Sequence, residues 1–377
     1  MKILLLCTFY TNYVIQLRNE IVKYNNAIQV DIFTREESKD KYIECFKNTD
    51  TRVYYSGGRR WSYIINTSKV LVKLQKYDVV HTLWMEEIWG ACAGILGWKS
   101  KAWLCSIGGS DLYRKASDRK SKIWENRVVR KSSMYSGENT ITLEYFRKVF
   151  RRSVNARIES RIIRFGVDII DSLNSLSIAN DRCREKYGII ENRIVVMLGY
   201  NGYIQQQHYE LLDSLSKVKK EIIDKCYFLL PMTYPDSNNM YIEEVENRIK
   251  QITSDYKVLV DYLTTDEMAE IARCTDIMVH VQTTDQLSSV MMSHMYNENI
   301  VIAGAWLPYS DIENAGIKFW KVDSIDNLNG KLEEIVNNYE CYKREVRGNK
   351  DKVYEFSSWE KCARKWIQAY YDLLEER

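Results

Sequence analysis

The feature that most constrains this chain is a repeated alternation of short apolar segments with longer amphipathic ones. Apolar runs at 2–7 and 77–81 are separated by segments whose apolar residues recur at helical spacing, as they do over 12–24. The same pattern restarts at 193–198. Strands that alternate with helical segments of about 10 to 15 residues form parallel β-α-β units. The sequence therefore predicts an α/β fold with two doubly wound parallel sheets.

The positions of the expected elements follow from this alternation. Strands are expected at 2–7, 27–34, 77–81, 101–107, 139–142 and 162–165, then at 193–198, 226–231, 256–260, 276–281 and 299–303. Helices are expected at 12–24, 64–75, 211–224, 240–252, 265–274 with Thr265 as its cap, 288–296 and 357–374.

The length of 377 residues fits two domains of about 150 residues each. We expect a first domain over 1–170, a polar linker over 171–191 and a second domain over 192–350. The segment 351–377 is expected to be a C-terminal helix, since its tryptophans and a cysteine recur at helical spacing.

The composition excludes several classes of protein. With 45% hydrophobic and 28% charged residues, the chain is neither disordered nor fibrous. No apolar run approaches the ~20 residues of a membrane span, and the apolar start is too short for a signal peptide. Nine scattered cysteines without a C-x-x-C pair, and four histidines without an H-x-x-x-H pair, predict a reduced cytoplasmic protein without a metal site.

The charge is distributed unevenly along the chain. From Lys99 to Arg164 there are 17 Lys and Arg against 6 Asp and Glu, an excess of +11, whereas the remainder has 37 against 45. Such a segment favours an anionic partner: phosphate, nucleic acid or an acidic membrane face. Solvated helix faces explain the same charges equally well.

In open α/β sheets, ligands bind beyond the carboxyl ends of the strands, so the residues that follow each expected strand are the candidates for a site. In the second half, Gly199, Asn201 and Gly202 follow one strand, and glycines there allow backbone amides to approach a phosphate. Asp285, Ser288 and Ser289 lie between another strand and a helix that offers hydroxyls and free amides. A plain turn and an ordinary N-cap are the competing explanations.

Further candidates follow other strands. Gly108, Gly109 and Asp111 belong to the matching loop of the first half, where Asp111 is a candidate base and a structural cap explains it equally well. Tyr234 lies in a loop over 231–239 that suits a base or a sugar, although turn chemistry also explains its Pro, Asp and Asn residues. His81 closes the strand 77–81, where a lone histidine is more often structural than part of an acceptor site.

Several of these segments resemble motifs of the retaining GT-B nucleotide-sugar glycosyltransferases. The segments YDVVH at 77–81, GSD at 109–111 and GVD at 166–168 resemble motifs of their first domain, and 263–304 resembles their donor-binding half. This resemblance implies the GT-B fold, with two Rossmann-like domains and a C-terminal helix that returns to the first domain.

The second half is also similar to enzymes that transfer 4-acetamido-4,6-dideoxygalactose onto lipid-linked intermediates. The shared features are the G-x-x-G at 199–202, His208 soon after it, and P-M-x-Y-P-x-x-N-x-x-Y-I-x-x-V at 231–245. The resemblance implies that the sugar nucleotide contacts the residues that follow these strands: Gly199, Asn201, Gly202, His208, Tyr234, Ser288, Ser289 and Ser293.

The chain departs from the retaining family at three places. Where that family has two glutamates eight positions apart, this chain has Asp285 and Ser293, and Ser293 is expected near the ribose. Gly108 replaces the histidine before G-x-D. Tyr203, Ile204 and the glutamines at 205–207 replace basic residues, so amides, hydroxyls or a distant Arg must meet the diphosphate charge. The stereochemical outcome therefore stays open.

These observations favour a glycosyltransferase that moves a sugar from a nucleotide diphosphate sugar to a lipid-diphosphate-linked glycan for a bacterial surface polysaccharide. We expect Asp285 and Asp111 to be catalytic, His81, Gly108 and Gly109 to lie on the acceptor side, and no metal or further cofactor. The segment 99–164 would face an anionic membrane at the inner face of the cell, without a nucleic-acid partner.

Two other classes remain open from the sequence. Ser293 and Gly108, at positions where the family has functional side chains, favour a catalytically silent subunit that binds glycan or stabilises a partner enzyme. The basic segment also carries Trp124, Tyr135, Tyr145 and Phe146, which is compatible with nucleic-acid binding, but it shows no known binding-module signature.

Overall fold

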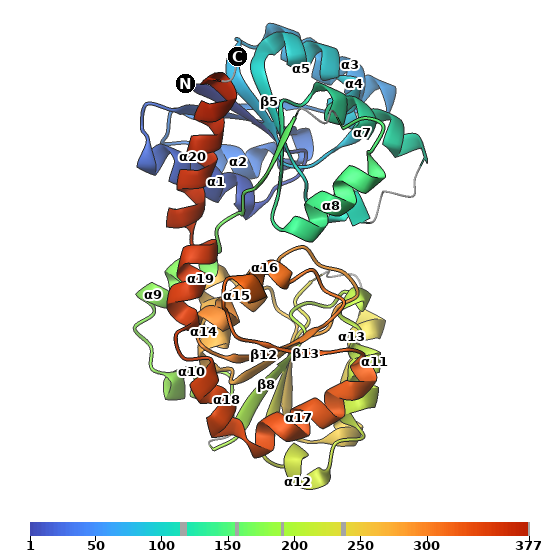
Figure 1. Ribbon diagram of the computed structural model, residues 1–377, viewed down its shortest axis with the longest axis vertical. Helices are drawn as coiled ribbons and strands as arrows, with labels where there is room; N and C mark the ends of the chain where they lie inside the picture. The colour runs from blue at the N-terminus through green and yellow to red at the C-terminus, as the bar shows by residue number, and fades with distance from the viewer. Residues whose placement is uncertain (114–118, 155–157, 190–191, 235–238, 376–377) are drawn as a thin grey trace. The chain divides into compact units, whose positions relative to one another are not determined.

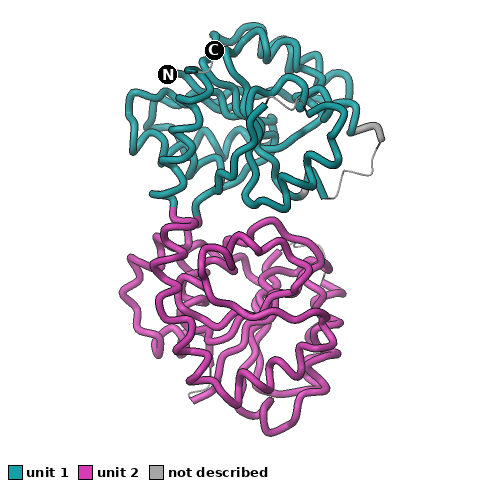
Figure 2. The backbone as a smooth tube through the Cα atoms, viewed as in Figure 1, with its two compact units in different colours: residues 1–166, 359–377 teal, residues 167–358 magenta. Residues whose placement is uncertain are grey.

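The computed structural model describes residues 1–113, 119–154, 158–189, 192–234 and 239–375 (Figure 1). The chain forms two compact units, coloured separately in Figure 2. Unit 1 consists of residues 1–166 and 359–377, and unit 2 consists of residues 167–358.

The sheet of unit 1 is entirely parallel and has the order β3-β2-β1-β4-β5-β6-β7. Its strands are β1 (Lys2–Leu6), β2 (Gln29–Arg35), β3 (Val53–Ser56), β4 (Tyr77–Thr82), β5 (Ser100–Ser106), β6 (Met134–Gly137) and β7 (Glu159–Ile162). The helices are α1 (Asn12–Tyr24), η1 (Glu36–Ser38), α2 (Lys39–Phe46), α3 (Trp61–Lys73), α4 (Glu87–Ala91), α5 (Ala93–Lys99), α6 (Ser110–Tyr113), α7 (Arg119–Lys131), α8 (Thr140–Val149) and α20 (Trp359–Glu375).

The sheet of unit 2 is also parallel, with the order β10-β9-β8-β11-β12-β13. Its strands are β8 (Ile194–Leu198), β9 (Cys226–Pro231), β10 (Tyr256–Leu259), β11 (Ile277–His280), β12 (Ile300–Gly304) and β13 (Trp320–Val322). The helices are α9 (Asp168–Ser175), α10 (Asn180–Lys186), η2 (Ile204–Gln206), α11 (His208–Leu215), α12 (Lys220–Ile223), α13 (Asn239–Ile252), α14 (Thr265–Cys274), α15 (Ser289–Tyr296), α16 (Ser310–Asn314), η3 (Ile325–Asn327), α17 (Leu328–Asn337), α18 (Tyr339–Glu345) and α19 (Asn349–Ser357).

Each sheet buries both of its faces, as the near-continuous apolar runs of parallel strands require. In β1, Ile3 and Leu5 belong to one apolar cluster while Leu4 and Leu6 belong to another. The strand β8 alternates in the same way between the two clusters of unit 2. The predicted α/β fold with two doubly wound parallel sheets is confirmed.

The C-terminal helix α20 belongs to unit 1, although more than 190 residues separate it from the rest of that unit. It packs beside α1 (Figure 1), and Trp359, Trp366 and Tyr370 are buried in the apolar cluster that also holds β1. Gly166 has no room for a side chain, because a Cβ there would lie 2.3 Å from the Trp359 ring. The return of this helix to the first unit is therefore confirmed.

The boundaries between the units differ from those expected. The segment 171–191 is not a linker in its described part, because α9 and α10 pack against α14 and bury Ile170, Leu173 and Cys183 in the core of unit 2. The segment 351–358 also belongs to unit 2, as the end of α19. The chain therefore passes between units at 166–167 and 358–359.

Four local expectations were wrong. The first is the strand 162–165, because β7 already ends at Ile162. Residues 139–142 do not form a strand, because the Asn139 side chain accepts a hydrogen bond from the Thr142 amide and caps α8. The cap of α14 is Thr264 rather than Thr265, and it forms a capping box with Glu267. The expected helix 211–224 is divided into α11 and α12.

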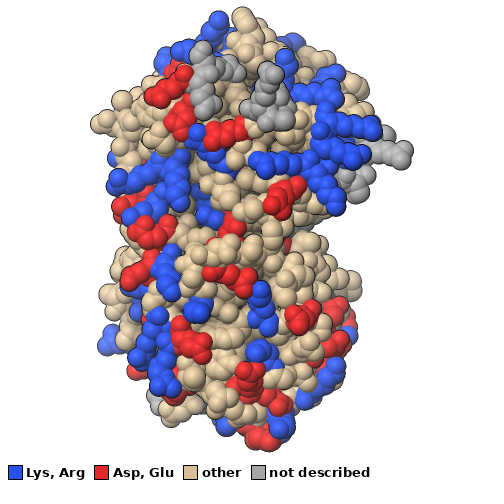
Figure 3. Space-filling view, viewed as in Figure 1, with Lys and Arg blue, Asp and Glu red and all other residues tan. Residues whose placement is uncertain are grey.

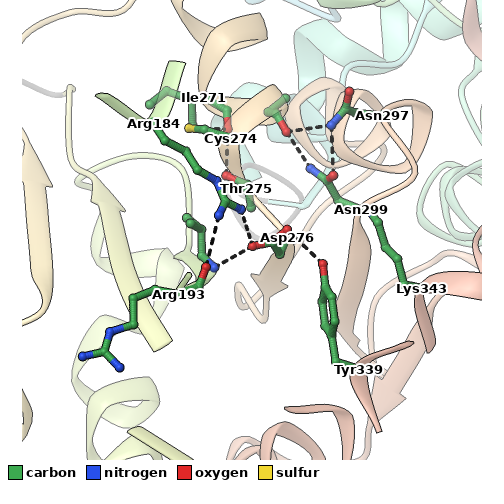
Figure 4. Close-up of polar contacts among 12 residues, drawn as sticks. Arg184, Arg193, Ile271, Cys274, Thr275, Asp276, Asn297, Asn299, Tyr339 and Lys343 are labelled. Atoms are coloured by element: carbon green, nitrogen blue, oxygen red, sulfur yellow. Dashed lines mark hydrogen bonds and ion pairs between the residues drawn. The ribbon is translucent and has the colours of Figure 1, made fainter. Parts of the chain in front are cut away.

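The amino end of the second sheet carries a tightly bonded polar cluster (Figure 4). Asp276, just before β11, accepts hydrogen bonds from the Arg184 guanidinium at 2.6 Å, the Val195 amide at 2.8 Å and the Tyr339 hydroxyl at 2.9 Å. Beside it, the Asn299 side-chain amide donates to the Ala272 carbonyl at 2.8 Å. These bonds connect α10, β8, α14 and α18 at the amino end of the sheet.

Candidate functional site

The order of the second sheet places one pair of loops at a topological switch point. The strands β8 and β11 are neighbours, but the chain continues from β8 towards β9 and β10, and from β11 towards β12 and β13. Ligands of open α/β sheets bind beyond the carboxyl ends of two such strands. The predicted donor residues after β8 and after β11 therefore lie in adjacent loops.

The loop after β8 is closed by backbone bonds. Gly199 has φ +66°, a left-handed conformation that favours glycine, and its amide donates to the Val279 carbonyl. The Gly202 amide donates to the Tyr234 carbonyl at 2.7 Å, and a Cβ there would crowd that same oxygen. The amides of both glycines are therefore occupied, so the free-amide argument does not hold for these two residues.

Asn201 and Tyr234 join the loops after β8 and β9. The buried Asn201 amide donates to the Tyr234 hydroxyl at 3.4 Å, while its oxygen accepts from the Tyr203 amide. Tyr234 stays partly exposed and meets the Tyr203 ring edge to face. The rest of the expected base- or sugar-binding loop, 235–238, lies outside the described residues.

Glutamines occupy the positions where the resembling family has basic residues. Gln206 donates to the Gln282 side chain at 2.9 Å, and Gln207 donates to the Val281 carbonyl. His208, the first residue of α11, is fully buried and bonded to the Tyr241 hydroxyl at 3.1 Å. Burial lowers the pKa of His208 to about 4, so the ring is neutral at pH 7. The His208 ring packs against Gly199, where a Cβ would lie 3.0 Å from its Nε2, so it fills the space beneath this loop.

The carboxylate of Asp285 is held in place by a buried chain of hydrogen bonds through Tyr309 and His280. The Tyr309 hydroxyl donates to Asp285, and His280 Nε2 lies 2.7 Å from the same hydroxyl. Burial and the Asp285 charge hold the pKa of Tyr309 well above its usual range, so this phenol stays protonated. Tyr200 stacks on His280, which joins the loop after β8 to this chain. The Asp285 side chain is 14% exposed.

The helix α15 contributes less to the site than the sequence suggests. The Ser288 side chain accepts from the Met291 amide, so it is the N-cap of this helix, and Ser289 is half-buried. Ser293 is buried inside the unit, where its hydroxyl donates to the Val290 carbonyl at 2.7 Å. The expectation that Ser293 contacts a ribose was wrong, because α15 is enclosed by protein along its length.

Three residues of this site were missed by the sequence analysis: Gln282, Trp306 and Tyr309. Trp306 and Tyr309 follow β12, and the Trp306 indole donates to the Gln282 carbonyl at 2.8 Å. A Cβ on Gly304 would collide with the Trp306 ring. The rule that sites follow the carboxyl ends of strands, applied to β12 as well, would have identified both aromatic residues.

In unit 1, His81 does not belong to a ligand site. Its ring is fully buried and bonded to the Tyr370 hydroxyl at 2.7 Å and the Ser106 hydroxyl at 2.6 Å. Burial lowers the pKa of His81 to about 3, which keeps the ring neutral. The acceptor-side expectation for His81 was wrong, since this residue ties β4 to β5 and α20.

Asp111 is also enclosed, and its catalytic role remains only a prediction. Its Oδ2 accepts from the Met85 amide at 2.8 Å, and burial raises the pKa of its carboxyl to about 7. Gly108 and Gly109 begin a short turn, in which the Gly109 carbonyl accepts from the Tyr113 amide. A Cβ on Gly108 would lie 2.0 Å from the Trp84 indole nitrogen, so an aromatic ring occupies the space that a larger side chain would take.

The basic segment forms a surface on α7, α8 and the turn after α8 (Figure 3). We call it the basic patch, and its exposed described residues are Arg127, Arg130, Lys131, Arg147, Lys148, Arg151 and Arg152. None of the seven has an ion pair with an acidic residue in the described part of the chain. By contrast, Lys99 is buried and bonded to a carbonyl, and Arg161 pairs with Asp372.

No helix within the described ranges is both long and apolar enough to span a membrane. In the same ranges, no three His, Cys, Asp or Glu side chains gather in a way that would hold a metal ion.

The comparison with protein families decides the class of this chain. The model of the 4-alpha-L-fucosyltransferase family, glycosyl transferase group 56, matches residues 14–288. The chain belongs to this family. It is therefore a glycosyltransferase, as the motifs predicted.

Solved structures share the fold at low sequence identity. A crystal structure of Anabaena Alr3699/HepE in complex with UDP and glucose is 12% identical, with a TM-score of 0.76, over 98% of this chain and 99% of that one. A glycosyltransferase from Rickettsia africae is 14% identical, with a TM-score of 0.77, over 100% and 99% of the two chains. Sucrose-phosphate synthase from Thermosynechococcus elongatus is 15% identical, with a TM-score of 0.77, over 100% of both. These matches confirm the GT-B fold.

Proposed function

We propose that this glycosyltransferase moves a sugar from a nucleotide diphosphate sugar to a lipid-diphosphate-linked glycan during synthesis of a bacterial surface polysaccharide. The donor would bind at the carboxyl end of the second sheet. The observation that carries this proposal is Asp285, a partly exposed carboxylate at the switch point that a buried phenol orients. A carboxylate in that position can hold a sugar hydroxyl or assist the departing group.

The diphosphate would meet neutral groups rather than cations. The loops 199–207, 281–289 and 305–309 contain no Lys or Arg. Thr283 and Thr284 are exposed just ahead of Asp285, and Ser289 at the start of α15 is half-buried. Hydroxyls and backbone amides bind phosphate oxygens by hydrogen bonds alone, which favours a modest affinity for the free nucleoside diphosphate.

The family and the structural neighbours suggest which donors to test first. The family is described as a fucosyltransferase family, so a 6-deoxyhexosyl donor is the first choice for the sugar. Alr3699/HepE binds UDP and UDP-glucose, so UDP is the first choice among nucleotides. The resemblance to transferases of a 4-acetamido-4,6-dideoxy sugar adds dTDP to the panel.

A donor panel tests the enzymatic part of this proposal. Purified protein would be mixed with UDP, GDP and dTDP sugars and a lipid-diphosphate-linked acceptor, and the release of nucleoside diphosphate would be measured with and without the acceptor. We expect acceptor-dependent release with one nucleotide class. Binding of an acceptor without release from any donor would instead favour a silent glycan-binding subunit.

The basic patch supports an acceptor at an anionic membrane. Each Lys or Arg near such a surface contributes about 1 kcal/mol, so replacing Arg147, Lys148, Arg151 and Arg152 by Gln should weaken vesicle binding by about 10³-fold at low salt. The matched control replaces four exposed lysines of unit 2, at 217, 219, 220 and 225. Equal binding of the two variants to phosphatidylglycerol vesicles would contradict the membrane proposal.

A further inference from the structure

The first sheet has its own switch point, between β1 and β4, and a carboxylate that the sequence analysis did not single out lies there. The chain continues from β1 to β2 on one side and from β4 to β5 on the other. The loops that follow β1 and β4 are 7–11 and 83–86. Glu86 is the last residue of the second loop and immediately precedes α4.

Hydrogen bonds to both oxygens hold the Glu86 carboxylate in place. The Thr8 amide donates to Oε2 at 3.1 Å, and the Thr8 hydroxyl donates to Oε1. The Trp89 indole donates to Oε2 at 2.9 Å from the first turn of α4. Three donors from two segments hold the side chain in one orientation, yet it stays half-buried rather than enclosed. Two of these donors belong to Thr8 in the loop after β1, so the carboxylate does more than begin α4.

An aromatic pair lies in the same two loops. Phe9 follows β1 and is 42% exposed, and its ring centroid lies 4.7 Å from that of Trp84. The Trp84 indole covers Gly108, where no side chain fits. Aromatic faces present a large apolar area on which the C–H face of a sugar ring can pack. Sugar-binding and proton-accepting groups therefore occur together at this switch point.

The buried Asp111 fixes the same loop. The Asp111 carboxylate accepts a hydrogen bond from the amide of Met85, the residue just before Glu86, and so fixes the backbone there. This contact gives Asp111 a positioning role from inside the unit, which agrees with its burial. The half-buried carboxylate that such positioning serves is Glu86.

We propose that Glu86 is the general base that takes the proton of the acceptor hydroxyl, with Phe9 and Trp84 packing against the acceptor sugar. The proposal rests on the proposed function. As the acceptor oxygen bonds to the anomeric carbon of the donor, its proton passes to Glu86. The bond between that carbon and the diphosphate oxygen breaks, and the nucleoside diphosphate leaves with the electron pair.

Among the described residues, the titratable groups near Glu86 include Cys7 just after β1, Tyr63 on α3 and Glu87 on α4. Burial, followed by the Glu86 charge, raises the pKa of both the Cys7 thiol and the Tyr63 phenol. These two groups stay protonated at neutral pH and cannot take the acceptor proton. Arg35 lies over the Tyr63 ring and pairs with Glu37.

The test compares Glu86→Gln with the matched variant Glu87→Gln, which removes the same charge from the exposed next residue. We expect Glu86→Gln to lower kcat for transfer by about 10²- to 10⁴-fold, to remove the acidic limb of the pH–rate profile, and to leave nucleoside diphosphate binding unchanged. Glu87→Gln should stay within threefold of the wild type. Glu86→Asp keeps the charge at a shorter reach, so it should retain the acidic limb with a reduced kcat.

Failure of this proposal is distinguishable from failure of the proposed function. An active wild type with a Glu86→Gln variant of similar kcat and an unchanged pH profile would overturn the role of Glu86 alone. A wild type that transfers no sugar from any donor would overturn both claims. If Glu86→Gln does not fold, Glu86→Asp decides, because an unchanged kcat in that variant contradicts a positioned base.

Discussion

Asp276 and Asp285 lie beyond opposite ends of β11, and their different partners indicate a structural role for the first and a functional role for the second. Asp276 precedes β11 and Asp285 follows it, and their side chains are almost equally exposed, at 13% and 14%. Asp276 is neutralised by a guanidinium and accepts two further hydrogen bonds (Figure 4). Asp285 accepts one neutral hydrogen bond and lies near His280. Burial alone therefore does not distinguish them, whereas their partners do.

The difference follows from the geometry of parallel sheets. The amino end of the sheet is where connecting helices return, so a carboxylate there can bond to several elements at once. The carboxyl end carries the loops that bind ligands. A carboxylate at that end keeps unused acceptor capacity when its protein partners are few. We therefore expect changes at Asp276 to affect stability and changes at Asp285 to affect catalysis.

Of the changes that test this comparison, replacing Asp285 should have the largest effect. Asp285→Asn removes the charge at the switch point but keeps the shape, so transfer should fall by about 10³-fold with little change in Tm, a loss typical of one electrostatic group in an active site. Steady-state kinetics and thermal unfolding measure the two quantities. Full activity in this variant would remove Asp285 from the mechanism.

Acid should destabilise both ends of the second unit. Burial lowers the pKa of His208 to about 4 and that of His294, which bonds to Asn299, to about 3. Between about pH 6.5 and 4 these two rings bind protons only when the unit is unfolded, so stability falls as the pH falls. Two protons correspond to about 2.7 kcal/mol per pH unit.

In unit 1 the corresponding effects oppose each other. Between about pH 6.5 and 4, His81 binds its proton only in the unfolded state, whereas Asp111, with a pKa of about 7, binds its proton first in the folded state.

Urea unfolding at several pH values measures the slope of the free energy of unfolding against pH. His294→Gln and His208→Gln should each remove about one proton from it, and an unchanged slope in both variants would contradict the assignment.

Replacing Asp276 should affect stability rather than catalysis. Asp276→Ala removes the acceptor of Arg184 Nη2 and of the Tyr339 hydroxyl, at a cost of about 2 kcal/mol in the free energy of unfolding. Urea denaturation measures this loss, and kcat per folded molecule should match the wild type. A variant with normal stability and reduced kcat would reverse the comparison between the two aspartates.

The smallest expected effect comes from the residue that orients Asp285. Tyr309→Phe removes one hydrogen bond to the carboxylate, so kcat should fall by about 10-fold, the equivalent of ~1.4 kcal/mol, with a nearly constant KM for the donor. Tyr339→Phe removes the matching phenol from Asp276 and is the control, with no expected effect on kcat. Equal kcat in these two variants would contradict the positioning role of Tyr309.

The sequence predicted the sheets and the loops better than the roles of single residues. The strand 226–231 and the helix 12–24 have the bounds that periodicity predicted. The strand is apolar and buried throughout, and the helix buries apolar residues at helical spacing on one face. His81 could not be assigned in this way, since its burial depends on Tyr370, which lies 289 positions away in the sequence. Glu86 carries no motif, and only the pairing of β1 with β4 shows that it meets Thr8.

Hydrogen–deuterium exchange with bound nucleoside diphosphate tests the central claim most directly, because it reads both ends of β11 in one experiment. With the nucleotide that supports transfer, we predict slower amide exchange in peptides that cover 199–207 and 281–289, and unchanged exchange in peptides that cover 271–277 and 297–299. Protection at the amino end of the sheet, or in unit 1 alone, would contradict a donor site at the carboxyl end of the second sheet.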